Sequence, residues 1–255
     1  MINFENIKVA FADKSDKDLS RAYLLFKTIS NPFISNTLTA FIKVAMWLHL
    51  PISWAIKATV YKHFCGGTTI ENSQATIDKL WESHIGTILD FSAEGKEIEE
   101  DFNLAMNETI ASIQKAKSES SIPFSVFKPT GLARFALLEK ISNNSNLTKE
   151  EEIEKTNFEG RIENICQTAS DNKVPLFIDA EESWIQGAID DIAIKMMQKF
   201  NKNEAWIYNT LQLYRNDRVD HLEMLFKLAA EEKFFVGLKL VRGAYHEQEI
   251  ERAKE

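Results

Sequence analysis

From residue 86 onward, apolar runs typical of strands alternate with helical stretches, and this alternation limits the fold more than any other feature. The expected strands are 86–92, 123–130, 175–182, 206–214 and 235–242. A helical stretch follows each of them, at about 97–118, from Thr148, through Lys199, at 217–233 and from about Glu247. Strands that alternate with helices predict a parallel sheet with right-handed crossovers, and runs this apolar indicate that both faces are covered.

Two kinds of α/β fold fit this order of elements. The doubly wound dinucleotide-binding fold lacks its fingerprint, because no GxGxxG follows the first expected strand. A (β/α)8 barrel of the TIM type is the better interpretation. That barrel needs eight units, and the sequence shows about five, so we expect a chain truncated at its C-terminus. We expect residues 1–82 to form an N-terminal helical arm and residues 83–255 to form the partial barrel.

The charge balance and the absence of certain patterns exclude several classes of protein. The 255 residues include 30 basic and 38 acidic side chains, and a net charge of −8 argues against nucleic acid as a partner. Neither the histidines nor the two cysteines show metal-ligand spacing, so no metal is expected. The first residues show neither a basic start nor an apolar signal core, so no signal peptide is expected. Polar residues interrupt the apolar segment 41–60, so no transmembrane segment is expected either. We expect a cytoplasmic protein, with peripheral contact at the inner face of a membrane kept open.

The fifth expected strand carries the most informative polar residue of the chain. Lys239 lies within an apolar run that breaks at Arg242, Gly243 and Ala244. A lysine on a buried strand must either pair with an opposite charge or take part in the protein's function, because an unpaired buried charge is costly. Barrel enzymes build their active sites at the carboxyl ends of the strands. The sequence therefore predicts a functional site where this strand ends.

Polar side chains also follow two earlier strands. Asp179 ends the third strand, where a carboxylate could bind a cationic group or act as a base. The alternative is that Asp179, with Glu181 and Glu182, provides negative charge at the start of the next helix. Lys128 ends the second strand and is either a charge partner for Asp90 or Asp179 or a nucleophilic amine.

Gln212 and His221 lie in the fourth expected strand and in the helical stretch after it. Gln212 lies in the fourth strand between two leucines, so its buried amide must find partners on neighbouring strands or on a ligand. His221 lies within the helical stretch 217–233 and is expected to be exposed.

Four segments of the chain together resemble the proline dehydrogenase family. They are PLFIDAEESWIQGAID, WIYNTLQLY, GLKLVRGAYHEQEIERA and, more loosely, FKPTGL at 127–132. These segments occur in the family's order at the ends of successive expected strands, which is more specific than any one motif. The resemblance covers roughly residues 64–255 and is closer to the stand-alone, mitochondrial-like enzymes than to the large bifunctional ones.

The resemblance implies a distorted (β/α)8 barrel that holds FAD and oxidises L-proline to 1-pyrroline-5-carboxylate. Hydride would pass from the proline C5 to the flavin N5, and a quinone or another acceptor would take the electrons. By the same resemblance Lys128 and Asp179 would lie beside the substrate, Gln212 would bond the flavin ring, and Lys239 would lie near N5. Gly243, Ala244 and Tyr245 would line the cofactor. Many relatives carry arginine at the position of Lys239, which keeps the charge but changes the geometry.

The family also clamps the proline carboxylate with a late arginine pair, and this sequence contains no Arg-Arg pair. Two other interpretations therefore stay open. One is a Schiff-base aldolase-type lyase that uses Lys128 or Lys239 as the amine. The other is an inactive fragment of the flavoenzyme, whose exposed barrel edges would make it prone to association.

Overall fold

The computed structural model describes residues 5–52, 54, 57–91 and 95–254. The chain divides into two compact units, Met1–Ile85 and Gly86–Glu255. Ser92, at the end of the first expected strand, lies outside the described residues, as do residues 53, 55 and 56 of the apolar segment.

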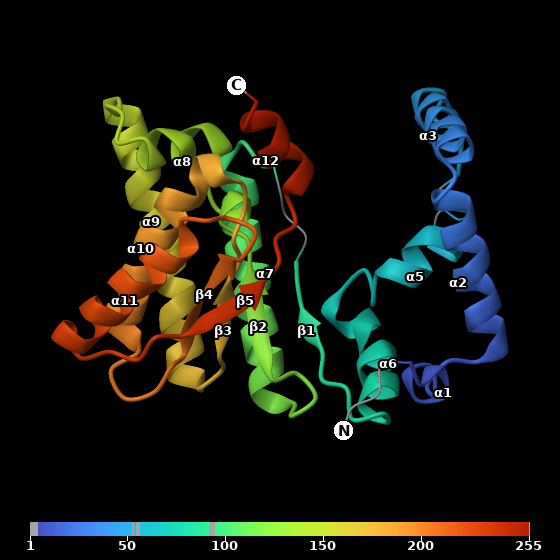
Figure 1. The fold of residues 1–255 in the computed structure, drawn as a ribbon, viewed down its shortest axis with the longest axis horizontal. Helices are drawn as coiled ribbons and strands as arrows, with labels where there is room; N and C mark the ends of the chain where they lie inside the picture. Colours follow the sequence, from blue (N-terminus) through green and yellow to red (C-terminus); the bar gives the residue numbers. More distant parts are fainter. Residues whose placement is uncertain (1–4, 53, 55–56, 92–94, 255) are drawn as a thin grey trace. The chain divides into compact units, whose positions relative to one another are not determined.

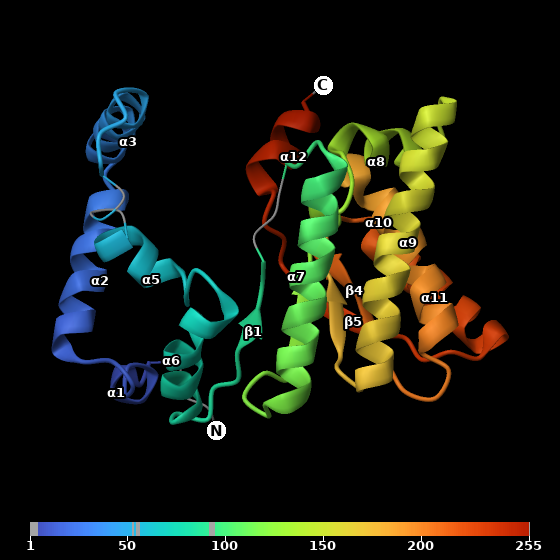
Figure 2. The same ribbon diagram turned by 180° about the vertical axis from the view of Figure 1, so that it is seen from behind.

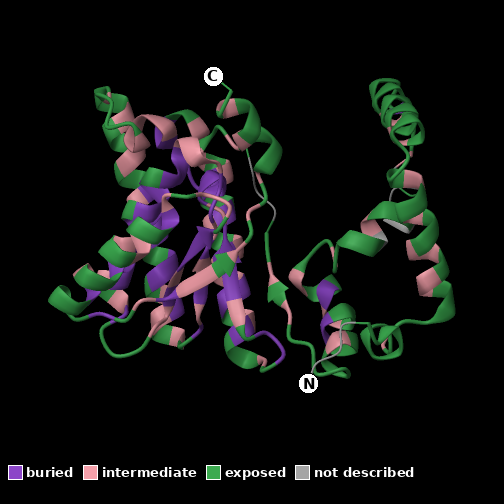
Figure 3. Ribbon diagram, in the orientation of Figure 1, coloured by how far each residue is buried: buried purple, intermediate pink, exposed green. Residues whose placement is uncertain are grey.

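The described part of the first unit contains helices and no strand. Its elements are α1 (Ile7–Ala10), α2 (Asp16–Ile29), α3 (Pro32–Trp47), the π-helical turn η1 (Lys57–Tyr61), α5 (Lys62–Phe64) and α6 (Ile70–Trp81). Ser15 and Asn31 cap α2 and α3 with side-chain oxygens that accept backbone N–H groups. Among the described residues of this unit only Ala45, Ser73 and Ile77 are buried, and α2 and α3 are mostly exposed (Figure 3). None of the helices in the described ranges has the length and apolar character that a membrane span requires.

The second unit is built on a five-stranded sheet in which every neighbouring pair is parallel. The strands lie side by side in chain order, β1 (Ile88–Leu89), β2 (Phe124–Phe127), β3 (Leu176–Ile178), β4 (Ile207–Gln212) and β5 (Leu238–Val241). The connecting elements are α7 (Glu99–Ser118), η2 (Pro129–Gly131), α8 (Phe135–Ser142), α9 (Lys149–Asn172), α10 (Ser183–Phe200) and α11 (Arg218–Glu232), and α12 (His246–Arg252) follows β5 (Figure 1). Five consecutive parallel strand–helix units confirm the expected partial (β/α)8 barrel.

The start of α9 shows how local sequence fixes an element. Thr148 accepts a hydrogen bond from the backbone N–H of Glu151, and the Glu151 carboxylate accepts one from the backbone N–H of Thr148. This reciprocal pair, a capping box, satisfies two N–H groups that a helix start leaves without partners.

The two faces of the sheet differ in what covers them. Ser125, Leu176 and Ile207 are register partners, and all three are fully buried on the face on which α7, α9 and α10 pack. We call this the outer face; α7 and α9 lie in front of the sheet in Figure 2 and behind it in Figure 1. Successive side chains of a strand point to opposite faces, so the next residues in register, such as Phe177 and Tyr208, lie on the opposite, inner face.

The strands at the two edges differ from the sequence expectation. Their apolar runs indicated that both faces would be covered, yet Ile88 of β1 is 43% exposed and Leu240 of β5 is 60% exposed. Among the described strands, each of these two has a neighbour on one side only, so its side chains are less covered than those of β2, β3 and β4. All five strands are also shorter than their apolar runs, because the runs continue into the loops. That β5 is an open edge strand agrees with the incomplete barrel expected.

Candidate functional site

Side chains from four strands meet on the inner face near the carboxyl ends of the strands. Lys239 lies beside Thr210 in register, and Gln212 is two residues further along β4 on the same face. Asp179 directly follows β3 and is two residues after Phe177, so it lies on the same inner face. Lys128 directly follows β2 and is two residues after Val126, so it lies on that face too. Alternation along parallel strands therefore brings together the four polar residues predicted from the sequence, which we call the inner cluster: Lys128, Asp179, Gln212 and Lys239.

The centre of the inner cluster is one carboxylate between two ammonium groups. The Nζ of Lys239 donates a hydrogen bond to Oδ1 of Asp179, and the Nζ of Lys128 lies 3.9 Å from Oδ2 of the same carboxylate. The three side chains are between 17% and 27% exposed, so solvent and small molecules can reach them. Asp179 is therefore paired with Lys239 of β5 and with Lys128, which follows β2. The N-cap position of α10 is occupied by Glu182, so Asp179 does not cap this helix.

Below these charges lies a layer of aromatic rings. Phe124 and Phe177 stack with their ring centroids 4.5 Å apart, and Tyr208 meets Phe177 edge-on at 5.6 Å. The Nζ of Lys239 lies 5.1 Å from the centroid of the Phe177 ring, close enough for a cation–π interaction. The inner face therefore carries these three aromatic rings, which we call the aromatic floor, next to the charged groups.

Gln212 is held by contacts at both ends of its amide. Its Nε2 donates to the backbone carbonyl of Glu181 at 2.7 Å. Its Oε1 accepts from the Tyr214 hydroxyl at 3.3 Å and from the Ala244 backbone N–H at 3.4 Å. Gln212 is 2% exposed, so these bonds are what makes burial of the amide tolerable.

The turn after β5 needs glycine for a reason visible in the structure. Gly243 has a φ of +125°, and a Cβ at this position would lie 1.4 Å from Cε1 of Tyr214. The backbone of this turn therefore packs directly against the Tyr214 ring. Ala244 follows it and reaches Gln212, while Tyr245 is the residue before α12. That Gly243, Ala244 and Tyr245 line a cofactor stays a prediction.

Burial perturbs the acid–base properties of two groups near the inner cluster. Burial raises the pKa of the Glu181 carboxyl to about 7, although hydrogen bonds from Thr130 and the charge of Lys128 act in the opposite direction. Burial also raises the pKa of Tyr214, and the carboxylate of Glu249 adds to this effect. Groups with perturbed pKa values gather at functional sites more often than elsewhere.

Comparison with known proteins identifies the family. The model of the family described as proline dehydrogenase matches residues 73–255. This range includes all five strands and every residue of the inner cluster.

The chain belongs to the proline dehydrogenase family.

Individual relatives agree with this assignment. The chain is 30% identical over 285 aligned positions to proline dehydrogenase 1, mitochondrial, of Dictyostelium discoideum, an alignment covering 96% of this chain and 50% of that protein. It is 33% identical over 186 positions to the carbapenem antibiotics biosynthesis protein CarD of Pectobacterium carotovorum subsp. carotovorum, covering 73% of this chain and 50% of that protein. The chain thus spans about half the length of these curated relatives.

A solved structure supports the fold independently. Proline utilization A from Bdellovibrio bacteriovorus, in its N-propargylglycine-inactivated form, superposes with a TM-score of 0.66 at 14% identity. The match covers 98% of this chain and 27% of that chain. At this identity the likeness concerns the fold, and it agrees with a partial (β/α)8 barrel of the proline dehydrogenase family.

A second polar cluster, which the sequence analysis missed, lies on the outer face of the same sheet. Asp190 of α10 accepts hydrogen bonds from Asn209 at 2.9 Å, Gln186 at 2.8 Å and Arg218 at 2.6 Å. We call Gln186, Asp190, Asn209 and Arg218 the outer cluster. His221, expected to be exposed, is 11% exposed and has its Nδ1 3.8 Å from Oδ2 of Asp190. The expectation for His221 was wrong because the helix turns this face toward α10.

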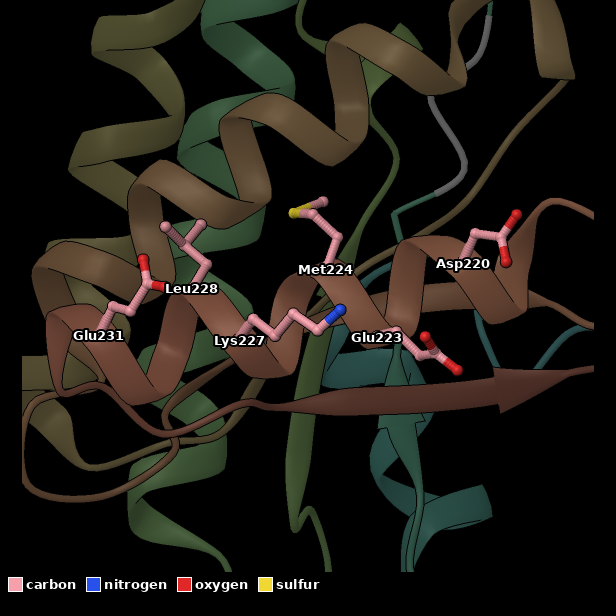
Figure 4. Close-up of a pocket in the computed structure, with 6 residues that line it drawn as sticks. All are labelled: Asp220, Glu223, Met224, Lys227, Leu228 and Glu231. Atoms are coloured by element: carbon pink, nitrogen blue, oxygen red, sulfur yellow. The ribbon is translucent and has the colours of Figure 1, made fainter.

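The other features of the described surface are separate from the inner cluster. A shallow hollow on α11 is lined by one helix only and shares no residue with the inner cluster (Figure 4). Its lining residues are Asp220, Glu223, Met224, Lys227, Leu228 and Glu231. Within the described ranges no three side chains of the metal-binding types gather as a metal site requires.

Proposed function

We propose that this chain serves in the FAD-dependent oxidation of L-proline to 1-pyrroline-5-carboxylate. The observation that carries the proposal is the position of the inner cluster. Two lysines hold Asp179 above an aromatic floor at the carboxyl ends of the strands, in a chain of the proline dehydrogenase family. This is the face and the end of a barrel where enzymes of this fold carry out their chemistry.

The residues of the inner face suit a flavin ring. The Thr210 hydroxyl is buried and finds no hydrogen-bond partner among the described residues, and it lies beside Lys239. An unpaired buried hydroxyl is costly, so a ligand that bonds it would be favoured. Gln212 has a second amide hydrogen beyond the one given to Glu181. Lys239, Thr210 and Gln212 together offer hydrogen-bond donors next to the aromatic floor, which suits a ligand that combines an apolar ring with polar ring atoms.

Each residue of the inner cluster then has a role that its chemistry supports. When bound, FAD supplies at N5 the acceptor for the hydride of proline C5. Asp179 would accept a hydrogen bond from the proline amine and orient the ring. Lys128 would lie beside the substrate, where its ammonium group can attract the carboxylate. Lys239 would stabilise negative charge that develops above the aromatic floor during the reaction. Gln212 would fix the plane of the ring through its amide.

The lyase interpretation is less well supported. A Schiff base requires a free amine, and both candidate amines, those of Lys128 and Lys239, are held by the Asp179 carboxylate. Borohydride trapping of a carbonyl substrate on either lysine would favour the lyase.

The direct test of the proposed function uses purified protein that carries residues 1–255, incubated with FAD. Flavin absorbance should bleach when L-proline is added under anaerobic conditions, and the product should react as 1-pyrroline-5-carboxylate. Bleaching by NADH but not by proline would contradict the proposal.

We further propose a cytoplasmic location with peripheral contact at the inner face of a membrane, where a quinone would be a suitable electron acceptor. Large apolar side chains of the first unit support this contact, among them Phe33 at 80% exposed, Trp47 at 77% and Trp54 at 74%. Co-sedimentation with phospholipid vesicles should be lost when Phe33 and Trp47 are both changed to serine. Equal sedimentation of both proteins would contradict the membrane contact.

A further inference from the structure

Glu181 is a buried carboxyl group to which the proposed function gives no role. It lies between β3 and α10, and it is 2% exposed. An ionised carboxylate is costly to bury unless hydrogen bonds compensate it. The contacts of Glu181 therefore show what its burial achieves.

The carboxylate binds a single residue at two points. Its Oε1 accepts the backbone N–H of Thr130 at 2.9 Å, and its Oε2 accepts the Thr130 hydroxyl at 2.5 Å. Thr130 belongs to η2, which Lys128 separates from β2, and is itself 5% exposed. The side chain of Glu181 thus joins the segment after β3 to the segment after β2.

The main chain of Glu181 makes two more connections. Its N–H donates to Oε1 of Gln186 in α10 at 3.0 Å, and its carbonyl accepts the amide of Gln212 at 2.7 Å. Asp179 is two residues before Glu181, and Lys128 is two residues before Thr130. Three members of the inner cluster are therefore attached to Glu181 directly or through two residues of backbone.

We propose that Glu181 is a positioning residue whose ionised carboxylate ties the end of β2 to the end of β3 and thereby sets the geometry of Lys128, Asp179 and Gln212. The importance of this tie for proline turnover rests on the function proposed above, whereas the tie itself does not. The hydrogen bonds between Glu181 and Thr130 form without FAD and without substrate.

The tie is sensitive to protonation. The charged groups that act on the carboxylate are Lys128, after β2, and Glu182, at the start of α10. Burial outweighs the hydrogen bonds and raises the pKa of Glu181 to about 7. A neutral carboxyl has one O–H donor and fewer acceptor sites, so it cannot accept both Thr130 bonds in the same way. Near neutral pH the two protonation states should therefore hold the strand ends differently.

Nuclear magnetic resonance can follow this tie without any activity. The backbone amide of Thr130 and the side-chain amide of Gln212 should both change chemical shift with pH, with a common inflection near pH 7 in the unmodified chain. Both inflections should vanish in Glu181→Gln. The matched control is Glu182→Gln, which removes the same charge one residue along and leaves both Thr130 bonds in place, so it should keep both inflections.

A second variant tests the direction of the effect. Thr130→Val removes the hydroxyl bond that stabilises the ionised carboxylate, so the inflection of the Gln212 amide should move to higher pH. A Thr130 amide that does not titrate between pH 5.5 and 8.5 in the unmodified chain would overturn the proposal, and this measurement needs no variant to fold. A Thr130 inflection without one at Gln212 would also overturn it, because the tie would then not reach the inner cluster.

Kinetics connect the tie to turnover. The KM for proline should change through the same pH range in the unmodified protein and in Glu182→Gln, and it should be flat in Glu181→Gln. If the Thr130 and Gln212 amides titrate together but proline does not bleach the flavin absorbance, the tie stands and the proposed function is overturned instead. A KM that is independent of pH in active unmodified protein would overturn the positioning role.

Discussion

Strand β4 separates two clusters built from the same kinds of residue. The inner cluster has lysine, aspartate and glutamine side chains, and the outer cluster has arginine, aspartate and amide side chains. Asn209 and Gln212 are three residues apart on this strand, so they point to opposite faces. Parity along one strand thus decides which cluster a polar residue joins.

The clusters differ in how completely their groups are satisfied and enclosed. The side chains of Arg218 and Asp190 are 9% and 7% exposed, and their ion pair has a 2.6 Å bond. Lys239 and Lys128, in contrast, are 27% and 20% exposed and share one carboxylate. The buried, fully paired charges of the outer cluster connect α10 and α11 to the sheet. The charges of the inner cluster are partly exposed, so a ligand can reach them. On this comparison we propose a structural role for the outer cluster and a chemical role for the inner one.

The largest effect is expected from Asp190→Ala in the outer cluster. This change removes the acceptor of three buried donors, those of Gln186, Asn209 and Arg218, while Arg218 keeps its ion pair with Asp217. At about 1–3 kcal/mol for each unsatisfied buried group, the free energy of unfolding should fall by about 3–5 kcal/mol. Urea denaturation measures the loss. Asp191→Ala is the matched control, because Asp191 is the adjacent residue and is exposed. Equal stability of the two variants would remove the outer cluster from its structural role.

Asp179→Ala should show the opposite pattern. Loss of the carboxylate between the two lysines should lower proline turnover by about 10²–10³-fold, as when a positioned polar group is removed from an active site. The free energy of unfolding should change little, because Asp179 caps no helix. A variant that keeps its turnover but loses about 0.5–2 kcal/mol of stability would show a capping role after all.

The pH dependence of stability should distinguish Glu181 from Asp217, the residue before α11. The pKa of Glu181 is raised from 4.5 to about 7, so the folded chain binds more protons than the unfolded chain between these values. Its contribution is therefore fully present below pH 4.5 and is lost as the pH rises through 7, by about 1–3 kcal/mol. Unfolding of the unmodified chain and of Glu181→Gln, compared at pH 5 and pH 8, measures the difference.

Asp217 should respond in the opposite direction. Burial alone would raise its pKa, but hydrogen bonds from Arg218 and Arg215 hold the pKa well below the usual 3.8. Its stabilisation is therefore present above pH 3.8 and is lost as the pH falls below that value. A loss of stability on going from pH 5 to pH 8 that persists in Glu181→Gln would contradict the assignment of that loss to Glu181.

Lys239→Met should have the smallest effect of the series. Removing a cation above the aromatic floor should lower the flavin reduction potential and slow reduction by proline about tenfold, equivalent to one charge-assisted hydrogen bond. Lys227→Met, on the exposed face of α11, is the control. An unchanged potential in Lys239→Met would exclude Lys239 from the neighbourhood of the flavin.

The sequence predicted the sheet and the inner cluster because both leave a local signal. An apolar run interrupted by a single lysine marks Lys239, and the change from strand to helix marks Asp179 and Lys128. The same pattern pointed to Asp179 rather than Glu181, since only the folded chain brings Thr130, 51 residues earlier, against the Glu181 carboxylate.

The outer cluster left no comparable signal. Asp190 lies beside Asp191 in a helix, and two adjacent acidic residues are typical of a solvent-exposed helix face. Its partners Asn209 and Arg218 are on other elements, so no local pattern links them to it. Asn209 was the one available clue, because an amide in an apolar strand needs a partner. The helix orientation that buries His221 depends on packing against α10, which no single segment encodes. Edge exposure of β1 and β5 likewise depends on which neighbours a strand has.

Hydrogen exchange with and without FAD tests the central claim most directly. If the inner face is the functional one, saturating FAD should slow amide exchange in peptides covering 127–131, 208–214 and 238–245. Peptides from the middle of α10 and from α11 should exchange at unchanged rates, since the outer cluster faces away from the ligand. Protection confined to α10 and α11, with the strand ends unchanged, would contradict the assignment of chemistry to the inner face.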